Sequence, residues 1–252
     1  MTRRVLRMIR DALPIPVRVR LRAGAEQLLN GTSIEGALWA LRKHGLSPAF
    51  CVDVGAYTGR WTRVCREIFP SAGVLMVEAQ ESKRAGLEHV AAELGPGVAV
   101  EIALLGPEDG RTVRFVEMET GSSVLEEHSH VERIVMEKEL KTLDRLLAAG
   151  SYPTADLVKL DVQGYELEVM RGASATLKTA RAVLLEASFL PINDGCPLIV
   201  DVLTFMRDAG FQLFDLFSVT RRRDDILWQS DLLFVRADSP LVREPSLDAT
   251  NW

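Results

Sequence analysis

The chain has 252 residues and a formal net charge of −5, and 47% of its residues are hydrophobic and 26% charged. This length and composition predict a globular protein, best explained as a single α/β domain, and exclude a wholly disordered chain. The negative net charge gives no general affinity for nucleic acid, so we expect no nucleic-acid partner.

The charge is unevenly distributed along the chain. Residues 1–22 contain seven arginines and one aspartate, a net charge of +6, so the other 230 residues carry −11. The spacing over 3–13 predicts an amphipathic helix with apolar residues on one side and arginines on the other. This basic head is interpreted as a helix with a solvated face, a peripheral contact with anionic lipid, or a lid over an acceptor cleft.

The sequence contains no signal for secretion or membrane insertion. Arginines interrupt the N-terminal region, so we expect no secretory signal, and no run of about 18 apolar residues predicts a membrane span. The three cysteines, at positions 51, 65 and 196, are too few and wrongly spaced for a disulfide framework or a zinc site. We therefore predict a reduced, cytoplasmic protein in which Cys51 and Cys65 are core thiols.

The pattern of predicted elements changes near residue 48. Before it, helices are predicted over 3–13, 18–29 and 33–45, the last beginning at Ser33 and ending at Gly45. From residue 49 to 210, strand and helix patterns alternate, which is typical of a doubly wound parallel sheet. Strands are predicted over 49–54, 73–78, 98–104, 157–161 and 182–186, and helices over 61–69, 82–94, 140–149, 166–171 and 199–209.

The remaining segments predict antiparallel and irregular structure. Residues 211–219 and 230–236 are predicted strands with only a charged turn between them, so they should pair antiparallel. Residues 111–117 alternate like an edge strand or hairpin arm, and 118–135 are predicted irregular. The polar end of the chain is expected to be loosely held. The predicted domains are a helical cap over 1–48, a sheet domain over 49–237 and a tail over 238–252.

The first candidate ligand-binding segment follows the first predicted strand, because ligands of open α/β sheets bind beyond the carboxyl ends of the strands. The segment from Asp53 to Gly59 has the spacing Asp-x-Gly-x-x-x-Gly. Gly55 and Gly59 permit a tight turn, and the helix that follows points its N–H groups at a ligand. Dinucleotide binders have Gly-x-Gly-x-x-Gly instead. Asp53 can hold the ammonium group of an amino-acid moiety, directly or through water.

The second candidate is Glu78, at the end of the next predicted strand and 19 residues beyond Gly59. A carboxylate at this position can accept hydrogen bonds from both ribose hydroxyls. Together the two strand ends predict a nucleoside that carries an amino-acid group, namely S-adenosylmethionine. A dehydrogenase on the same fold is an alternative, which the missing third glycine disfavours.

Longer segments resemble the FkbM-type S-adenosylmethionine-dependent methyltransferases. The resemblance covers about residues 49–236 and not the helical head, and the run 158–173 carries most of it. The other segments that contribute are 52–59, 77–79, 142–144, 184–186 and 230–235. Two positions depart from the family: Gln163 stands where it usually has Glu, and Gln80-Glu81 where it has a turn containing proline. Gln163 cannot act as a base or a charged ligand.

The resemblance implies a Rossmann-like class I methyltransferase fold, with a seven-stranded, mostly parallel sheet and an antiparallel terminal hairpin. It also implies O-methylation of a hydroxyl group, often on a sugar or a polyketide-like natural product. A small hydroxylated acceptor is therefore the expected partner, and no oligomeric state is predicted. The residues expected to bind the cofactor are Asp53, Gly55, Tyr57, Thr58, Gly59, Glu78, Ala79, Ala103, Ser123 and Asp161.

The reaction also needs a group that takes the proton of the acceptor hydroxyl. Asp161 and Glu186, at the ends of adjacent predicted strands, and the histidines His128 and His130 are the candidates, and we expect Asp161, Glu186 and His130 to be catalytic. Asp161 and Glu186 can alternatively hold a divalent cation between them, or support the neighbouring loops. No residue is assigned as a metal ligand.

Three further features have two interpretations each. Ser122 and Ser123 resemble the family's turn before the acceptor site, or form an ordinary polar loop. Trp228 and Gln229, just before the last predicted strand, line the acceptor pocket or a surface hairpin. Lys159, inside a strand, should be structural and need a carboxylate partner. Two other functions stay open: a non-catalytic module that keeps the cofactor pocket, which Gln163 favours, and a membrane-surface partner protein that acts through residues 1–22.

Overall fold

A computed structural model describes residues 33–118, 121–125, 134–191, 193 and 195–241. The predictions for the helices over 3–13 and 18–29, for the basic residues 1–22 and for His128 and His130 lie outside the described residues. The third predicted helix is α3 (Ile34–Lys43), where Ser33 accepts a hydrogen bond from the Gly36 N–H at 3.2 Å. The chain leaves it through Gly45, whose φ of 98° is left-handed.

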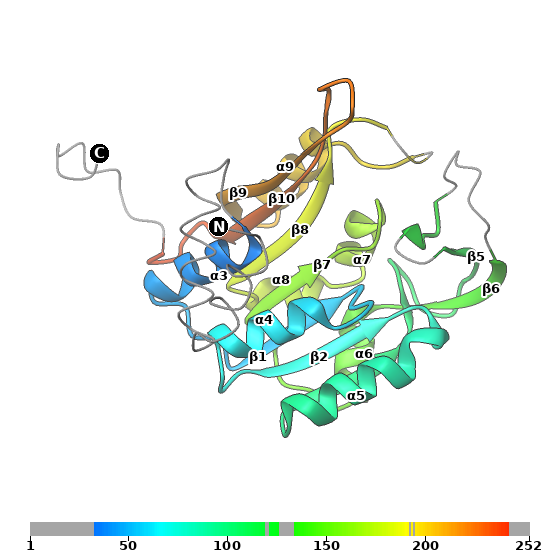
Figure 1. Cartoon of the computed structure of the whole chain (residues 1–252), viewed down its shortest axis with the longest axis horizontal. Helices are drawn as coiled ribbons and strands as arrows, with labels where there is room; N and C mark the ends of the chain where they lie inside the picture. Colours follow the sequence, from blue (N-terminus) through cyan, green and yellow to red (C-terminus); the bar gives the residue numbers. More distant parts are fainter. Residues whose placement is uncertain (1–32, 119–120, 126–133, 192, 194, 242–252) are drawn as a thin grey trace, which may run out of the picture.

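The main sheet has seven strands in the order β3-β2-β1-β7-β8-β10-β9 (Figure 1). All neighbours from β3 to β8 pair parallel, whereas β10 is antiparallel to both β8 and β9. This confirms the predicted Rossmann-like class I methyltransferase fold with its antiparallel terminal hairpin. The strands are β1 (Phe50–Val54), β2 (Gly73–Glu78), β3 (Val98–Ile102), β7 (Leu157–Leu160), β8 (Ala182–Ser188), β9 (Phe211–Arg221) and β10 (Leu227–Arg236).

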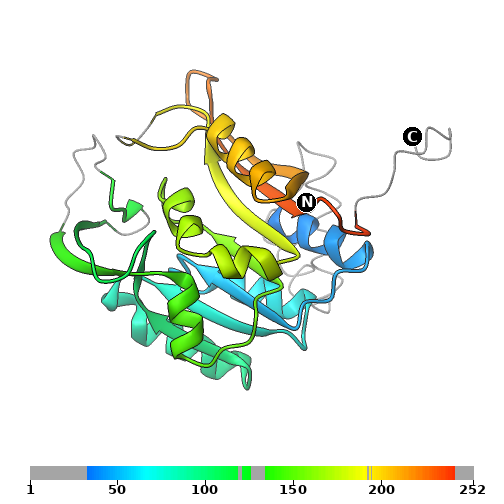
Figure 2. The same ribbon diagram turned by 180° about the vertical axis from the view of Figure 1, so that it is seen from behind.

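Helices cover both faces of this sheet. The face in front in Figure 1 carries α3, α4 (Arg60–Ile68) and, after the 3-10 turn η1 (Glu81–Lys83), α5 (Arg84–Leu94). The face in front in Figure 2 carries α6 (Leu143–Ala149), α7 (Glu166–Arg171), α8 (Ser174–Thr179) and α9 (Ile199–Asp208). All residues of β1 and β7 are buried, as expected for parallel strands covered on both sides.

Alternate residues of β1 enter the two cores on either side of the sheet. Val52 and Val54 pack with the core beneath α6–α9, whereas Cys51 packs with α3 and α4. The Cys51 and Cys65 sulfur atoms are 3.7 Å apart, and both side chains are buried, as predicted for core thiols.

A second sheet has three strands in the order β4-β6-β5, and here two predictions are wrong. Its strands are β4 (Leu104–Leu105), β5 (Thr112–Glu117) and β6 (Ile134–Lys141). The predicted strand 98–104 divides at Ala103, whose N–H bonds the Glu78 carbonyl, and Leu104 pairs with β6 instead. Residues 134–135, expected to be irregular, and 140–141, expected to be helical, belong to β6, which pairs antiparallel with all of β5 and parallel with β4.

Three smaller differences concern the end of the chain and α8. Because β10 begins at Leu227, Trp228 and Gln229 lie within the strand and not before it. The unpredicted α8 begins where the Asp144 carboxylate accepts hydrogen bonds from the backbone N–H groups of residues 175 and 176, at 2.7 and 2.8 Å. Leu241, in the tail expected to be loosely held, is 4% exposed and packs with the α3–α4 core.

No helix in the described part of the chain combines the length and apolar character needed to cross a bilayer.

Candidate functional site

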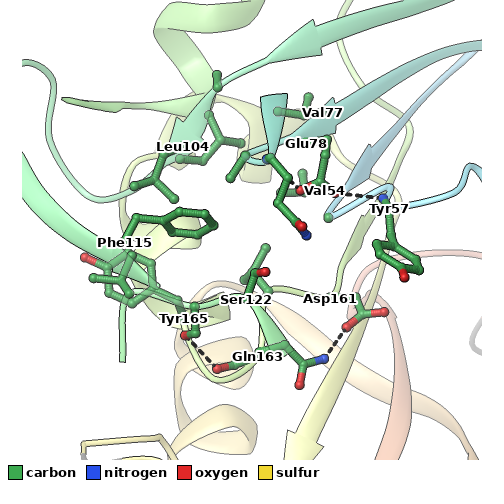
Figure 3. Close-up of a pocket in the computed structure, with 18 residues that line it drawn as sticks. Val54, Tyr57, Val77, Glu78, Leu104, Phe115, Ser122, Asp161, Gln163 and Tyr165 are labelled. Carbon is green, nitrogen blue, oxygen red and sulfur yellow. Dashed lines mark hydrogen bonds between the residues drawn. The ribbon is translucent and has the colours of Figure 1, made fainter. Parts of the chain in front are cut away.

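A cavity of about 160 Å³ opens at the carboxyl ends of β1, β2 and β7 (Figure 3). The second sheet closes one side of it through β4 and β5, and residues 122–124 complete the wall. Seven of the ten residues expected to bind the cofactor line this cavity, and these are Gly55, Tyr57, Glu78, Ala79, Ala103, Ser123 and Asp161. The structure therefore brings together side chains from segments more than 100 residues apart in sequence.

The turn after β1 requires a glycine at position 55. Gly55 has a φ of 73°, and a Cβ atom on it would lie 1.9 Å from the backbone carbonyl oxygen of Asp161. Its N–H donates to the Val77 carbonyl at 2.9 Å. The turn is thereby held against the end of β2 and against the loop that follows β7, and this contact places the Asp161 loop at the cavity.

Glu78 is a buried carboxylate that points into the cavity between Val54 and Val77 (Figure 3). One of its oxygens accepts the Tyr57 N–H at 2.7 Å and the other accepts the Gln80 N–H at 2.9 Å. These bonds fix the carboxylate, and each oxygen keeps a second lone pair. Glu78 can therefore still accept hydrogen bonds from two adjacent hydroxyl groups of a ligand.

The opposite side of the cavity is mainly apolar. Leu104, Phe115 and Tyr165 lie together on this side in Figure 3, away from Tyr57 and Asp161. Leu104 and Phe115 were not among the predicted site residues because they belong to the second sheet, and Tyr165, which precedes α7, was not predicted to line the site either. Alternation over 111–117 was the one available signal, since it marks the face of β5 on which Phe115 is buried.

Lys138 connects the second sheet to the loop after β2. Its ammonium group donates a hydrogen bond to the Ala79 carbonyl and lies 5.1 Å from the centroid of the Phe115 ring. The contact holds the apolar wall against the segment that carries Glu78.

Asp53 lies behind the cavity wall and not in it. Its side chain is fully buried, and its oxygens accept the Thr62 hydroxyl at 2.7 Å and lie 3.2 Å from the Lys159 ammonium group. The expected contact between Asp53 and a ligand's ammonium group is thus replaced by an internal ion pair. Two other predicted residues also lie outside the lining: Thr58 is exposed, and Gly59 precedes α4 with a left-handed φ of 69°.

Lys159 has the carboxylate partner that was predicted from its position inside a strand. Besides Asp53, its ammonium group lies 3.5 Å from Asp161 and donates to the Gly55 carbonyl at 3.0 Å. Burial alone would lower the pKa of Lys159, but the two carboxylates outweigh it and raise the pKa above its ordinary value. A charged lysine therefore ties β1 to β7 directly beneath the cavity.

Asp161 stands between the cavity and a second acidic group. Its side chain is 43% exposed, and it accepts a hydrogen bond from the Gln163 side chain at 3.0 Å. Glu186, at the end of the neighbouring strand β8, does not line the cavity and accepts the Gln229 side-chain N–H at 2.6 Å. Asp231 faces Glu186 across the β8–β10 pair. Within the described residues, no three His, Cys, Asp or Glu side chains are grouped to hold a metal ion.

The acids beyond Asp161 are difficult to ionise. Burial raises the pKa of Glu186 to about 8, and the charges of Asp161, Glu166 and Asp231 add to the increase. Burial also raises the pKa of Asp231, to about 6, and its hydrogen bond with Ser218 limits the increase. At neutral pH the Glu186 carboxyl group is therefore mostly protonated and can donate a hydrogen bond.

The raised pKa of Glu186 predicts how stability depends on pH. Because its pKa is higher in the folded state, its contribution to stability is complete below the unfolded pKa near 4.5 and is lost as the pH rises through about 8. We expect Glu186→Gln to flatten the fall in unfolding free energy between pH 5 and 8, by up to about 1.4 kcal/mol per pH unit. Urea denaturation at a series of pH values measures this slope.

The matched control is Glu93→Gln, which changes a surface carboxylate. The pKa of Glu93 is lowered, mainly by its hydrogen bond with Arg63. That variant should keep the wild-type slope over the same range. Equal slopes for wild type and Glu186→Gln would contradict the assignment of a raised pKa to Glu186.

Comparison with known proteins adds a family match. The model of the methyltransferase FkbM domain matches residues 53–213. No curated protein matches the chain. Among solved structures, magnesium protoporphyrin IX methyltransferase from Synechocystis PCC 6803 is 14% identical with a TM-score of 0.48, over 89% of this chain and 86% of that one. Precorrin-6y C5,15-methyltransferase from Geobacter metallireducens GS-15 is 12% identical with a TM-score of 0.47, over 80% and 87%.

Proposed function

Because the chain belongs to the FkbM methyltransferase family, we propose that it is an S-adenosylmethionine-dependent O-methyltransferase acting on a hydroxyl of a sugar or natural product. The charge of the cavity is the observation that supports this cofactor. Its 18 lining residues include the carboxylates Glu78 and Asp161, and no Lys, Arg or His stands among them. A cationic sulfonium suits such a site. The pyrophosphate of a dinucleotide does not, which argues against a dehydrogenase.

The two sides of the cavity fit the two parts of a nucleoside. Glu78 keeps free lone pairs for two ribose hydroxyls, as described above. The apolar side with Leu104 and Phe115 suits the flat face of a base. The turn at Gly55, next to the backbone of Asp161, would then face the amino-acid portion of the cofactor.

The reaction needs a positioned hydroxyl and an acceptor for its proton. The bound cofactor supplies an electrophilic methyl group, and positioning alone contributes about 7–11 kcal/mol to such reactions in favourable cases. Asp161, partly exposed at the cavity, is the carboxylate that we assign to take the proton from the hydroxyl. Glu186 does not line the cavity, so it is given no contact with the reacting oxygen.

The cofactor assignment predicts the effect of Glu78→Ala. Removing the carboxylate deletes two charge-assisted hydrogen bonds to the ribose, so the affinity for S-adenosylmethionine should fall by at least about 100-fold. Isothermal titration calorimetry measures the affinity, and transfer of a labelled methyl group to a panel of hydroxylated compounds measures the activity.

The control is Glu88→Ala, which removes an exposed carboxylate of α5 that lies 3.9 Å from Arg84. It should bind the cofactor like wild type. Unchanged binding by a folded Glu78→Ala protein would refute the ribose assignment. Tight binding by wild type without transfer to any hydroxylated compound would favour the non-catalytic module instead.

A further inference from the structure

Glu166 is a buried acidic residue that none of the assignments above uses. It is the first residue of α7 and is 4% exposed. One of its carboxylate oxygens accepts two backbone hydrogen bonds, from the Val162 N–H at 2.9 Å and the Gly164 N–H at 3.3 Å. Both donors belong to residues 161–165, the loop after β7, four of whose residues line the cavity. Glu166 therefore contacts this loop without lining the cavity itself.

The backbone of this loop has a conformation that needs support. Gln163 and Gly164 have consecutive left-handed φ values of 55° and 93°. For a residue with a side chain such a conformation is strained and persists only where its surroundings impose it. A Cβ atom at position 164 would lie 2.9 Å from the Cys196 sulfur, so a glycine is needed there.

Hydrogen bonds from two other segments meet the same loop at a single atom. The Gln163 carbonyl accepts the Ser123 hydroxyl at 3.0 Å and the Asn193 side-chain N–H at 3.1 Å. Ser123 belongs to the cavity wall, and Asn193 follows β8, the strand that carries Glu186. These bonds hold Gln163 in the middle of the loop. The two bonds to Glu166 hold its neighbours, Val162 and Gly164.

From these contacts we infer that Glu166 is a positioning residue, which fixes the loop 161–165 and thereby the place of Asp161 at the cavity. The predicted effect on methyl transfer rests on the proposed function. The anchor, meaning the two hydrogen bonds by which Glu166 holds the loop, does not depend on that function. Burial raises the pKa of Glu166 to about 7, against the backbone hydrogen bonds, which lower it. Because a protonated carboxyl group keeps acceptor capacity, the anchor operates on both sides of this pKa.

The test compares Glu166→Gln with Glu166→Leu. Glutamine keeps an acceptor oxygen in the same place, so kcat should stay within about threefold of wild type. Leucine has a similar volume but leaves the Val162 and Gly164 N–H groups without a partner. We expect it to lower kcat at least about tenfold, with a much smaller change in the KM for S-adenosylmethionine. Glu166→Ala carries the same expectation and replaces the leucine variant if that does not fold.

The control is Glu168→Leu on the same helix, where the exposed carboxylate pairs with Arg171, and its kcat should match wild type. Amide hydrogen exchange gives a readout independent of activity. The amides of Val162 and Gly164 should exchange slowly in wild type and Glu166→Gln, and rapidly in Glu166→Leu. If wild type transfers no methyl group, the proposed function fails, and these exchange rates still decide whether the anchor exists.

Two results would overturn the inference. One is slow exchange with wild-type kcat in the leucine variant, which would show that the loop holds its conformation without Glu166. The other is a glutamine variant as impaired as the leucine variant, because the negative charge would then matter and not the acceptor oxygen.

Discussion

Replacing Lys159 with methionine is expected to lower the free energy of unfolding by about 3–5 kcal/mol. Methionine has a similar length, so packing in β7 is largely preserved while the charge is lost. Asp53, which is fully buried, would then keep the Thr62 hydroxyl as its one hydrogen-bond donor among the described residues. An uncompensated carboxylate in this position is strongly destabilising. Equilibrium urea denaturation at pH 7, followed by circular dichroism, measures the change.

Two further variants show whether the loss comes from the ion pair. Lys159→Met combined with Asp53→Asn should recover a large part of the lost stability, because no charge then stays buried. Arg63→Ala breaks a much more exposed ion pair, in which Arg63 and Glu93 are 2.6 Å apart, and should cost less than about 1 kcal/mol. A loss of that small size for Lys159→Met would show that Asp53 is not the charged partner of Lys159.

Gly55→Ala is expected to lower the free energy of unfolding by about 4 kcal/mol or more, and to abolish cofactor binding by whatever protein stays folded. The added methyl group meets the Asp161 carbonyl oxygen at 1.9 Å, so β1 and β7 would have to separate at the cavity. The left-handed φ of 73° adds backbone strain. Urea denaturation gives the stability, and calorimetry with S-adenosylmethionine gives the binding.

Gly45→Ala is the matched control, because Gly45 has a left-handed φ of 98° and no atom within 4 Å of the added Cβ. It isolates the cost of the left-handed backbone, on the order of 1–2 kcal/mol. The difference in unfolding free energy between the two variants measures the cost of the steric clash between the added methyl group and the chain after β7. Equal costs would mean that this clash contributes nothing to the loss of stability.

The centre of the main sheet could be predicted from sequence because β1, β2, β7 and β8 are buried on both faces. Such strands form continuous apolar runs, and the bounds predicted for β2 agree with the structure at both ends. β6 could not be found in this way, since its first residues are exposed and charged residues follow them. Its identity as a strand depends on pairing with β5, a contact that periodicity within β6 does not encode.

A site residue could be placed from sequence when its position at the end of a strand was enough to bring it to the cavity. It could not be placed when the direction of its side chain also mattered. Glu78 lines the cavity because it ends β2, and the topology places every such residue at one edge of the sheet. Asp53 lies one residue before the end of β1, and its side chain enters the core beneath. Glu166 gave no signal, because its bonds to the Val162 and Gly164 amides follow from a loop conformation that no sequence pattern predicts.

The second sheet and the seven-stranded sheet are two parts of the protein that can change independently during evolution. The second sheet forms the apolar side of the cavity, yet in the described part of the chain none of its strands pairs with the seven-stranded sheet. Substitutions in β5 or β6 can therefore reshape the wall that faces the ligand without disturbing the parallel core. The residues that end β1, β2 and β7 lack this freedom, because each of them also holds the core together. Sequence variation among related chains is thus expected to be greater in β5 and β6 than at these strand ends.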